Sequence, residues 1–151
     1  MMMIGRIPAV MLLLATSACL PTGPDDTAAL RQGMLRWAAR APASYQIVLR
    51  RTSCECTPAM LATVQVTVRE REVRSVIDVQ TGEPVTTELY HVMTIEQLFG
   101  VVADALDQDA HRVTVEYDDE WGYPSSIYID YDRQMVDDEL SITAQDLTPV
   151  E

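Results

Sequence analysis

The chain has 151 residues and a formal net charge of −12 at neutral pH, and it contains no lysine. So acidic a protein is repelled by phosphates and by anionic lipid headgroups, and we therefore expect neither nucleic-acid binding nor electrostatic membrane binding. The length suits a single domain with one hydrophobic core.

The chain begins with the pattern of an export signal. Arg6 precedes an apolar run over residues 7–14, and the small residues 15–18 lead into Cys19. This order predicts a signal peptide over residues 1–18, because the apolar run is too short to span a bilayer. Cleavage would remove Arg6 and take the formal charge from −12 to −13.

Cys19 is the candidate lipidation site. Residues 16–19 read Thr-Ser-Ala-Cys, which resembles the lipobox of bacterial lipoproteins, although Thr16 stands where that motif prefers leucine. The alternative is an ordinary secretory signal that is cut after Ala18. With lipidation, residues 19–25 form a short tether ahead of a domain over residues 26–151, and the acyl chains supply the membrane contact. We then expect the protein in the bacterial cell envelope, facing the periplasm or the surface.

Two stretches have helical periodicity. In the first, which covers residues 26–40, apolar residues recur on one face and Pro42 ends the pattern. This stripe consists of Leu30, Met34, Trp37, Ala38 and Ala41. The second helix starts at Thr94, which forms a capping box with Gln97, and it continues to about Leu106.

Six stretches favour β-strands. Four of them alternate apolar and polar residues, and two weaker ones cover residues 73–79 and 140–147. The alternating residues are Tyr45/Ile47/Leu49, Val64/Val66/Val68, Val113/Val115/Tyr117 and Ile127/Ile129/Tyr131. Alternation leaves one face of a sheet wet and the other buried, so the expected fold is α+β, with two helices packed on one side of a mainly antiparallel sheet. The order helix, three strands, helix, three strands further suggests a duplicated αβββ unit.

Several short motifs together resemble a known family. They are Trp37 and Tyr45, Cys54-Glu55-Cys56, the segment 94–99, Gly122-Tyr123-Pro124, the segment 127–130 and Asp137-Asp138-Glu139. As a set these motifs resemble the bacterial lipoprotein family known as domain of unknown function 6174. The resemblance covers about residues 30–147 and implies an envelope location and a shared fold, without an activity. One departure is that Arg71-Glu72 stands where the family tends to have a glycine-containing turn.

Cys54 and Cys56 are the clearest candidates for chemistry. In an exported protein we favour a local disulfide between them that clips the loop after the first strand. In a regular strand their Cα atoms would lie ~6.6 Å apart, so the bond requires a turn there. Thiol-disulfide exchange and metal capture with His91 or His111 are the alternatives.

Acidic residues crowd the C-terminal third of the chain. The weak candidates for a calcium site are Asp130, Asp132, Asp137, Asp138 and Glu139, since Ca²⁺ takes carboxylate oxygens. Their spacing does not match an EF-hand loop, and a solvated acidic face is the simpler interpretation. We therefore expect that the protein has no cofactor.

Gly122-Tyr123-Pro124 predicts a turn between two strands. Trp121 and Tyr123 beside it are weak candidates for an interaction surface, because aromatic residues dominate binding hot spots.

The chain carries neither a G-x-S-x-G nor an H-E-x-x-H motif, and we therefore expect that the protein is not an enzyme. The function expected from the sequence is thus a membrane-tethered binding module with a protein partner. The alternatives are divalent-ion binding by the acidic face and thiol-disulfide function of Cys54 and Cys56.

Overall fold

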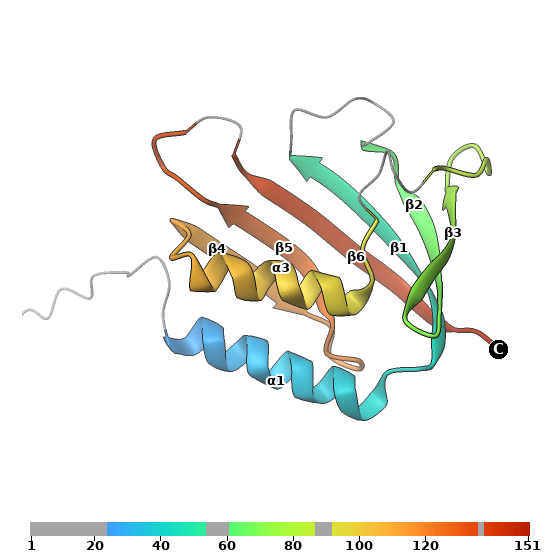
Figure 1. Cartoon of the computed structure of the whole chain (residues 1–151), viewed down its shortest axis with the longest axis horizontal. Helices are drawn as coiled ribbons and strands as arrows, with labels where there is room; N and C mark the ends of the chain where they lie inside the picture. The colour runs from blue at the N-terminus through green and yellow to red at the C-terminus, as the bar shows by residue number, and fades with distance from the viewer. Residues whose placement is uncertain (1–23, 54–60, 87–91, 136–137) are drawn as a thin grey trace, which may run out of the picture.

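A computed structural model describes residues 24–53, 61–86, 92–135 and 138–151 of the chain. The described residues form two helices and six strands (Figure 1). Their bounds are α1 Pro24–Arg40, β1 Ser44–Ser53, β2 Val64–Arg69, β3 Glu72–Asp78, α3 Ile95–Asp107, β4 Arg112–Tyr117, β5 Pro124–Asp130 and β6 Leu140–Pro149. The predicted α+β class and the predicted order of elements are confirmed.

The six strands form one open sheet in the order β3-β2-β1-β6-β5-β4. All neighbouring strands are antiparallel. The two long strands β1 and β6 pair in the centre, while β3 and β4 form the edges. The first strand of one αβββ half therefore pairs with the last strand of the other. No two-fold axis exchanges the halves in this order, so the duplication stays a hypothesis about the order of elements along the chain.

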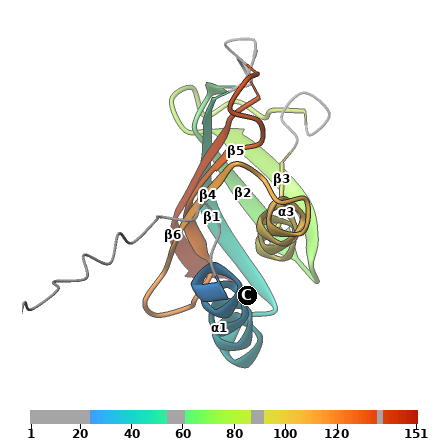
Figure 2. The ribbon, with the colours of Figure 1, turned by 90° about the vertical axis from the view of Figure 1, so that its left-hand side faces the viewer.

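Both helices lie on the same side of the sheet (Figure 2). The strands bury alternate residues against them, as in β2, where Val64, Val66 and Val68 are fully buried and the residues between them are not. From the helix side, Leu98 and Val102 of α3 complete this core. Alternation in the strands and the 3.6-residue period in the helix thus place their apolar faces together.

The start of α3 is fixed by the predicted capping box. The Thr94 hydroxyl accepts a hydrogen bond from the backbone N–H of Gln97 at 3.4 Å, and the Gln97 side-chain oxygen accepts one from the backbone N–H of Thr94 at 2.8 Å. This reciprocal pair satisfies free donors of the first turn. It thereby sets the position of Glu96, which lies in that turn.

Helix α1 is held against the turn between β4 and β5. The Arg36 side chain donates to the carbonyl oxygens of Asp118 and Asp119 at 3.3 Å each, and Arg40 donates to the carbonyl oxygen of Glu120. Within the turn, Gly122 adopts a φ of +82°, a left-handed conformation that glycine takes without strain. The predicted turn at Gly122-Tyr123-Pro124 therefore anchors the first helix.

Candidate functional site

A groove with a volume of about 600 Å³ opens where α1, the start of α3 and the turn between β2 and β3 meet. Its volume is within the range of about 300–1,000 Å³ that is typical of small-molecule sites. The groove is lined by Met34, Trp37, Ala38, Ala41, Pro42, Ala43, Tyr45, Glu70, Arg71, Glu96 and Phe99. Most of these side chains are apolar, and the three charged ones come from the β2–β3 turn and from the first turn of α3.

The floor of the groove is aromatic and firmly held. Trp37 is only 5% exposed and packs edge-to-face on Tyr45, with ring centroids 5.6 Å apart and an interplanar angle of 89°. The Tyr45 hydroxyl accepts a hydrogen bond from the backbone N–H of Ile95 at 3.0 Å. Burial raises the pKa of Tyr45 well above its usual range, and the Glu96 carboxylate adds to this effect while the Ile95 hydrogen bond opposes it. Tyr45 is therefore a neutral, fixed part of the floor.

Glu96, which belongs to α3, is hydrogen-bonded to this aromatic floor. Its Oε1 accepts a hydrogen bond from the Trp37 indole Nε1–H at 3.3 Å. Glu96 lies in the first turn of α3, one residue after the helix begins at Ile95. The groove thus has a carboxylate whose position is set by both helices.

The opposite rim is the two-residue turn between β2 and β3. Arg69 and Glu72 face each other across the hairpin, and Glu70 and Arg71 between them have φ values of +53° and +65°. Two left-handed residues in succession are typical of a type I′ turn, which strongly favours asparagine and glycine. Each non-glycine residue in this conformation costs on the order of 1 kcal/mol. The loop lies one position earlier than the sequence suggested, at Glu70-Arg71 instead of Arg71-Glu72.

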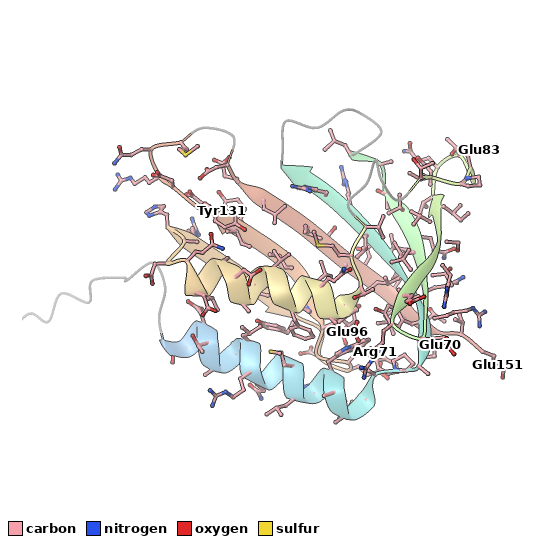
Figure 3. The ribbon with its side chains drawn as sticks, viewed as in Figure 1. Glu70, Arg71, Glu83, Glu96, Tyr131 and Glu151 are labelled. Atoms are coloured by element: carbon pink, nitrogen blue, oxygen red, sulfur yellow. The ribbon has the colours of Figure 1, made fainter. Side chains whose placement is uncertain are left out.

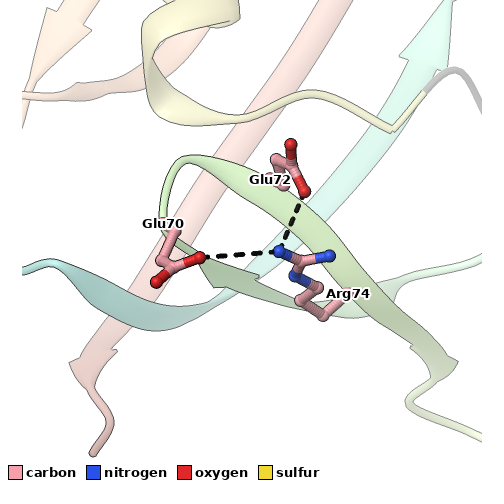
Figure 4. A network of polar contacts seen from close by, with 3 residues as sticks. All are labelled: Glu70, Glu72 and Arg74. Atoms are coloured by element: carbon pink, nitrogen blue, oxygen red, sulfur yellow. Dashed lines mark ion pairs between the residues drawn. The ribbon is translucent and has the colours of Figure 1, made fainter.

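Among the charged side chains of the hairpin, Arg74 forms ion pairs with two glutamates (Figure 4). Arg74 lies 2.9 Å from Glu72 and 3.8 Å from Glu70, and all three side chains are largely exposed, so these ion pairs add little stability. Arg71 makes no hydrogen bond or ion pair within the described part of the chain. In Figure 3, Arg71, Glu70 and Glu96 lie in the same corner of the molecule. The strained turn therefore places Arg71 at the rim of the groove, where no other described side chain pairs with its charge.

The sequence analysis identified some of the groove residues as members of the apolar stripe of the first helix. Of this stripe, Leu30 and Trp37 are buried. Met34, in contrast, is 47% exposed, and Ala38 and Ala41 are also exposed. The stripe continues beyond the surface that α3 covers, and this uncovered remainder is the α1 wall of the groove. Glu70, Arg71 and Glu96 had no signal in the sequence that pointed to a shared site.

The candidate interaction residues Trp121 and Tyr123 have different environments. Tyr123 is only 3% exposed and packs edge-to-face on Trp37, with ring centroids 6.4 Å apart. It is a core residue, and it is not available as an exposed anchor. Trp121 is partly buried against the core, and its backbone N–H donates to Asp118 Oδ1 at 2.6 Å.

The acidic candidates for a calcium site lie in and around the β5–β6 connection. The backbone N–H of Asp132 donates to Asp138 Oδ2 at 2.6 Å, and Asp132 Oδ1 accepts from the backbone N–H of Gln134 at 2.9 Å. Within the ranges that the structure describes, no three His, Cys, Asp or Glu side chains are close enough to hold a metal ion. Asp130 and Glu139 are described and belong to no such group, whereas Asp137 lies outside the described residues.

The three cysteines also lie outside the described residues, namely the lipidation candidate Cys19 and the disulfide candidates Cys54 and Cys56. His91 lies outside them as well. No helix in the described part of the chain is both long and apolar enough to cross a membrane.

Together, the fold and the groove define a two-layer α+β domain with a preformed, largely apolar groove at one end of its helical layer. The chain belongs to the family of unknown function DUF6174, whose model matches residues 29–149. This match confirms the family resemblance and covers nearly the whole described fold, including every residue that lines the groove. Neither the curated proteins nor the solved structures contain a match to the chain.

Proposed function

We propose that the protein is an exported lipoprotein, tethered to a membrane of the bacterial cell envelope by lipid on Cys19, whose domain is a non-catalytic binding module. The groove between α1 and α3 is its binding site. The observation that carries this proposal is the open groove over a fixed aromatic floor, in which Trp37 is held by Tyr45 and Glu96. A preformed site avoids ordering costs when a ligand binds.

The residues that line the groove support binding rather than covalent chemistry. None of the described residues that line it is a Ser, Thr, Cys or His, and its charged groups are Glu70, Arg71 and Glu96. These can hold a ligand by charge while the apolar wall removes its nonpolar surface from water. A protein partner, as expected from the sequence, would insert a few side chains into this volume, and a small ligand would fill it.

An unbiased test of the binding site is a fragment screen by NMR on the folded domain. We expect the fragments that bind to shift the Trp37 and Phe99 signals. Ala38→Trp should abolish these shifts by filling the groove. Ala39→Trp is the matched control, because Ala39 is an exposed neighbour on the same helix that does not line the groove. Fragments that bind elsewhere, or binding that survives Ala38→Trp, would contradict the proposed site.

The tether is tested by membrane fractionation of cells that express the full chain. Cys19→Ser should move the protein from the carbonate-washed membrane pellet to the soluble fraction, since diacylation is what makes attachment stable. Cys54→Ser is the control, because it also removes one cysteine but leaves the expected anchor intact. A Cys19→Ser protein that stays in the pellet would show that lipid on Cys19 is not the anchor.

A further inference from the structure

The rim of the groove carries charges of both signs. Glu96 lies on the side of α3, and Arg71 with Glu70 lies on the side of the β2–β3 turn. A purely apolar ligand would leave Arg71 without a partner, and a ligand with a single charge would interact with only one side of the groove. The combination is complementary to a ligand with one positive and one negative group near its apolar part.

Arg71 indicates the negative group of such a ligand. It has a left-handed φ of +65° although an asparagine or glycine would suit the turn better, and its guanidinium has no partner among the described residues. Nothing in the fold therefore explains an arginine at this position. A guanidinium at the mouth of a groove suits a carboxylate, because its parallel N–H groups can bind both oxygens.

Glu96 indicates the positive group. Its Oε1 is occupied by the Trp37 indole N–H at 3.3 Å, and its other oxygen makes no hydrogen bond within the described residues. The carboxylate thus has a fixed position and a free acceptor beside the aromatic floor. An ammonium group would fit there, since it can donate to Glu96 while the attached carbon chain contacts the floor.

We propose that the groove binds small zwitterionic amphiphiles of the class of short apolar peptides with free ends, with the ammonium group at Glu96 and the carboxylate at Arg71. The inference rests on the proposed binding function and names its ligand class. A volume of about 600 Å³ is ample for a dipeptide with two large apolar side chains. Met34, Phe99 and Trp37 would contact those side chains.

The test uses the dipeptide Leu-Phe and its three blocked forms, which are acetylated, amidated or both. Binding is followed through the Trp37 indole N–H signal in the NMR spectrum, which Trp121→Phe helps to assign. We expect Leu-Phe to bind most tightly. Each blocking group should weaken binding about tenfold, because it removes one hydrogen bond between charged groups. In Glu96→Gln the effect of acetylation should vanish, and in Arg71→Gln the effect of amidation should vanish.

Two matched variants control for general electrostatics. Glu72→Gln changes the charge by the same amount as Glu96→Gln, and Arg74→Gln by the same amount as Arg71→Gln. Glu72 and Arg74 lie in the same hairpin as Arg71, but neither residue lines the groove. Both should keep the full effect of blocking. Equal binding of all four peptides, or tighter binding of a blocked form, would overturn the ligand class while leaving the groove as the site, provided that Ala38→Trp still abolishes binding. If none of the four binds at millimolar concentration, the inference also fails, and the fragment screen decides separately on the binding function.

Discussion

Gly33 of α1 and Gly122 of the β4–β5 turn approach each other so closely that neither position has room for a side chain. A Cβ atom at Gly33 would lie 2.9 Å from the carbonyl oxygen of Gly122, and a Cβ atom at Gly122 would lie 3.0 Å from the carbonyl oxygen of Gly33. This contact, together with the Arg36 and Arg40 hydrogen bonds to the same turn, sets the position of α1. It therefore also sets the α1 wall of the groove.

The first prediction concerns this contact. Alanine is favoured over glycine in a helix by about 1 kcal/mol, but at Gly33 its Cβ would also lie 2.7 Å from the Tyr117 ring. Overpacking of this kind costs roughly 1–3 kcal/mol. We expect Gly33→Ala to lower the free energy of unfolding in urea by up to about 2 kcal/mol, because the gain in helix propensity offsets part of the cost of overpacking.

The control is Gly100 in α3, where an added Cβ meets nothing within 4 Å. Gly100→Ala should raise the free energy of unfolding by about 0.5–1 kcal/mol, since only the helix propensity changes. If Gly33→Ala were as stable as Gly100→Ala, the close approach of α1 to the turn would not exist in solution.

The second prediction concerns the strained turn at the rim. Arg71→Gly removes a non-glycine residue from a φ of +65°, so it should raise the free energy of unfolding by up to about 1 kcal/mol. The same variant should weaken binding of Leu-Phe. A gain in stability with a loss of binding is expected where a strained residue serves the site.

Gly82 provides the converse control. It has a φ of +71° and open space around it, so Gly82→Ala introduces backbone strain alone and should lower the free energy of unfolding by about 1 kcal/mol. A marked loss of stability in Arg71→Gly would mean that Arg71 has a structural role that the described contacts do not include.

The sequence pattern predicts the elements well and the site poorly, for physical reasons. Alternation in residues 64–68 shows which side chains are buried, but it does not determine which strand lies alongside, so the central β1–β6 pairing could not be derived from it. The apolar stripe of α1 likewise does not show how far its neighbour extends. Met34 and Trp37 look equivalent in the sequence, yet only Trp37 is covered. The groove arises from that difference in coverage, which is a tertiary property.

The third prediction concerns alkaline pH. Burial, with a contribution from Asp118, raises the pKa of Tyr123 from 10 to about 12, and burial raises the pKa of Tyr45 further. Between about pH 10 and 12 the unfolded chain therefore loses tyrosine protons that the folded chain keeps. The stabilisation by these tyrosines is complete below pH 10 and is lost as the pH rises towards 12, by up to about 1.4 kcal/mol per pH unit for each buried tyrosine.

The chain suits this measurement, because it has no lysine that would titrate in the same range. Urea unfolding at a series of pH values from 8 to about 11.5 should give a stability that falls steeply above pH 10. In Tyr123→Phe the slope should be smaller, whatever the variant's stability at pH 8. An unchanged slope would mean that Tyr123 ionises normally in the folded protein.

The fourth prediction concerns Cys54 and Cys56, which are separated by one residue. An exported protein folds in an oxidising compartment, where a short loop with turn-forming neighbours can close a disulfide. The mass of the exported Cys19→Ser protein should therefore be two hydrogens lower than that of the reduced chain. An alkylating reagent should add no mass until the protein has been reduced.

The bond should act as a structural clip, without a ligand of its own. Reduction would then remove a constraint on the loop after β1 and leave the binding of Leu-Phe unchanged, because the groove lies beside Tyr45 at the start of β1 and both cysteines follow the end of that strand in the sequence. Cys54→Ser together with Cys56→Ser should match the reduced protein in its urea midpoint. Free thiols in the exported protein, or a divalent ion that stays bound in native mass spectrometry, would instead favour the thiol or metal alternatives for this pair.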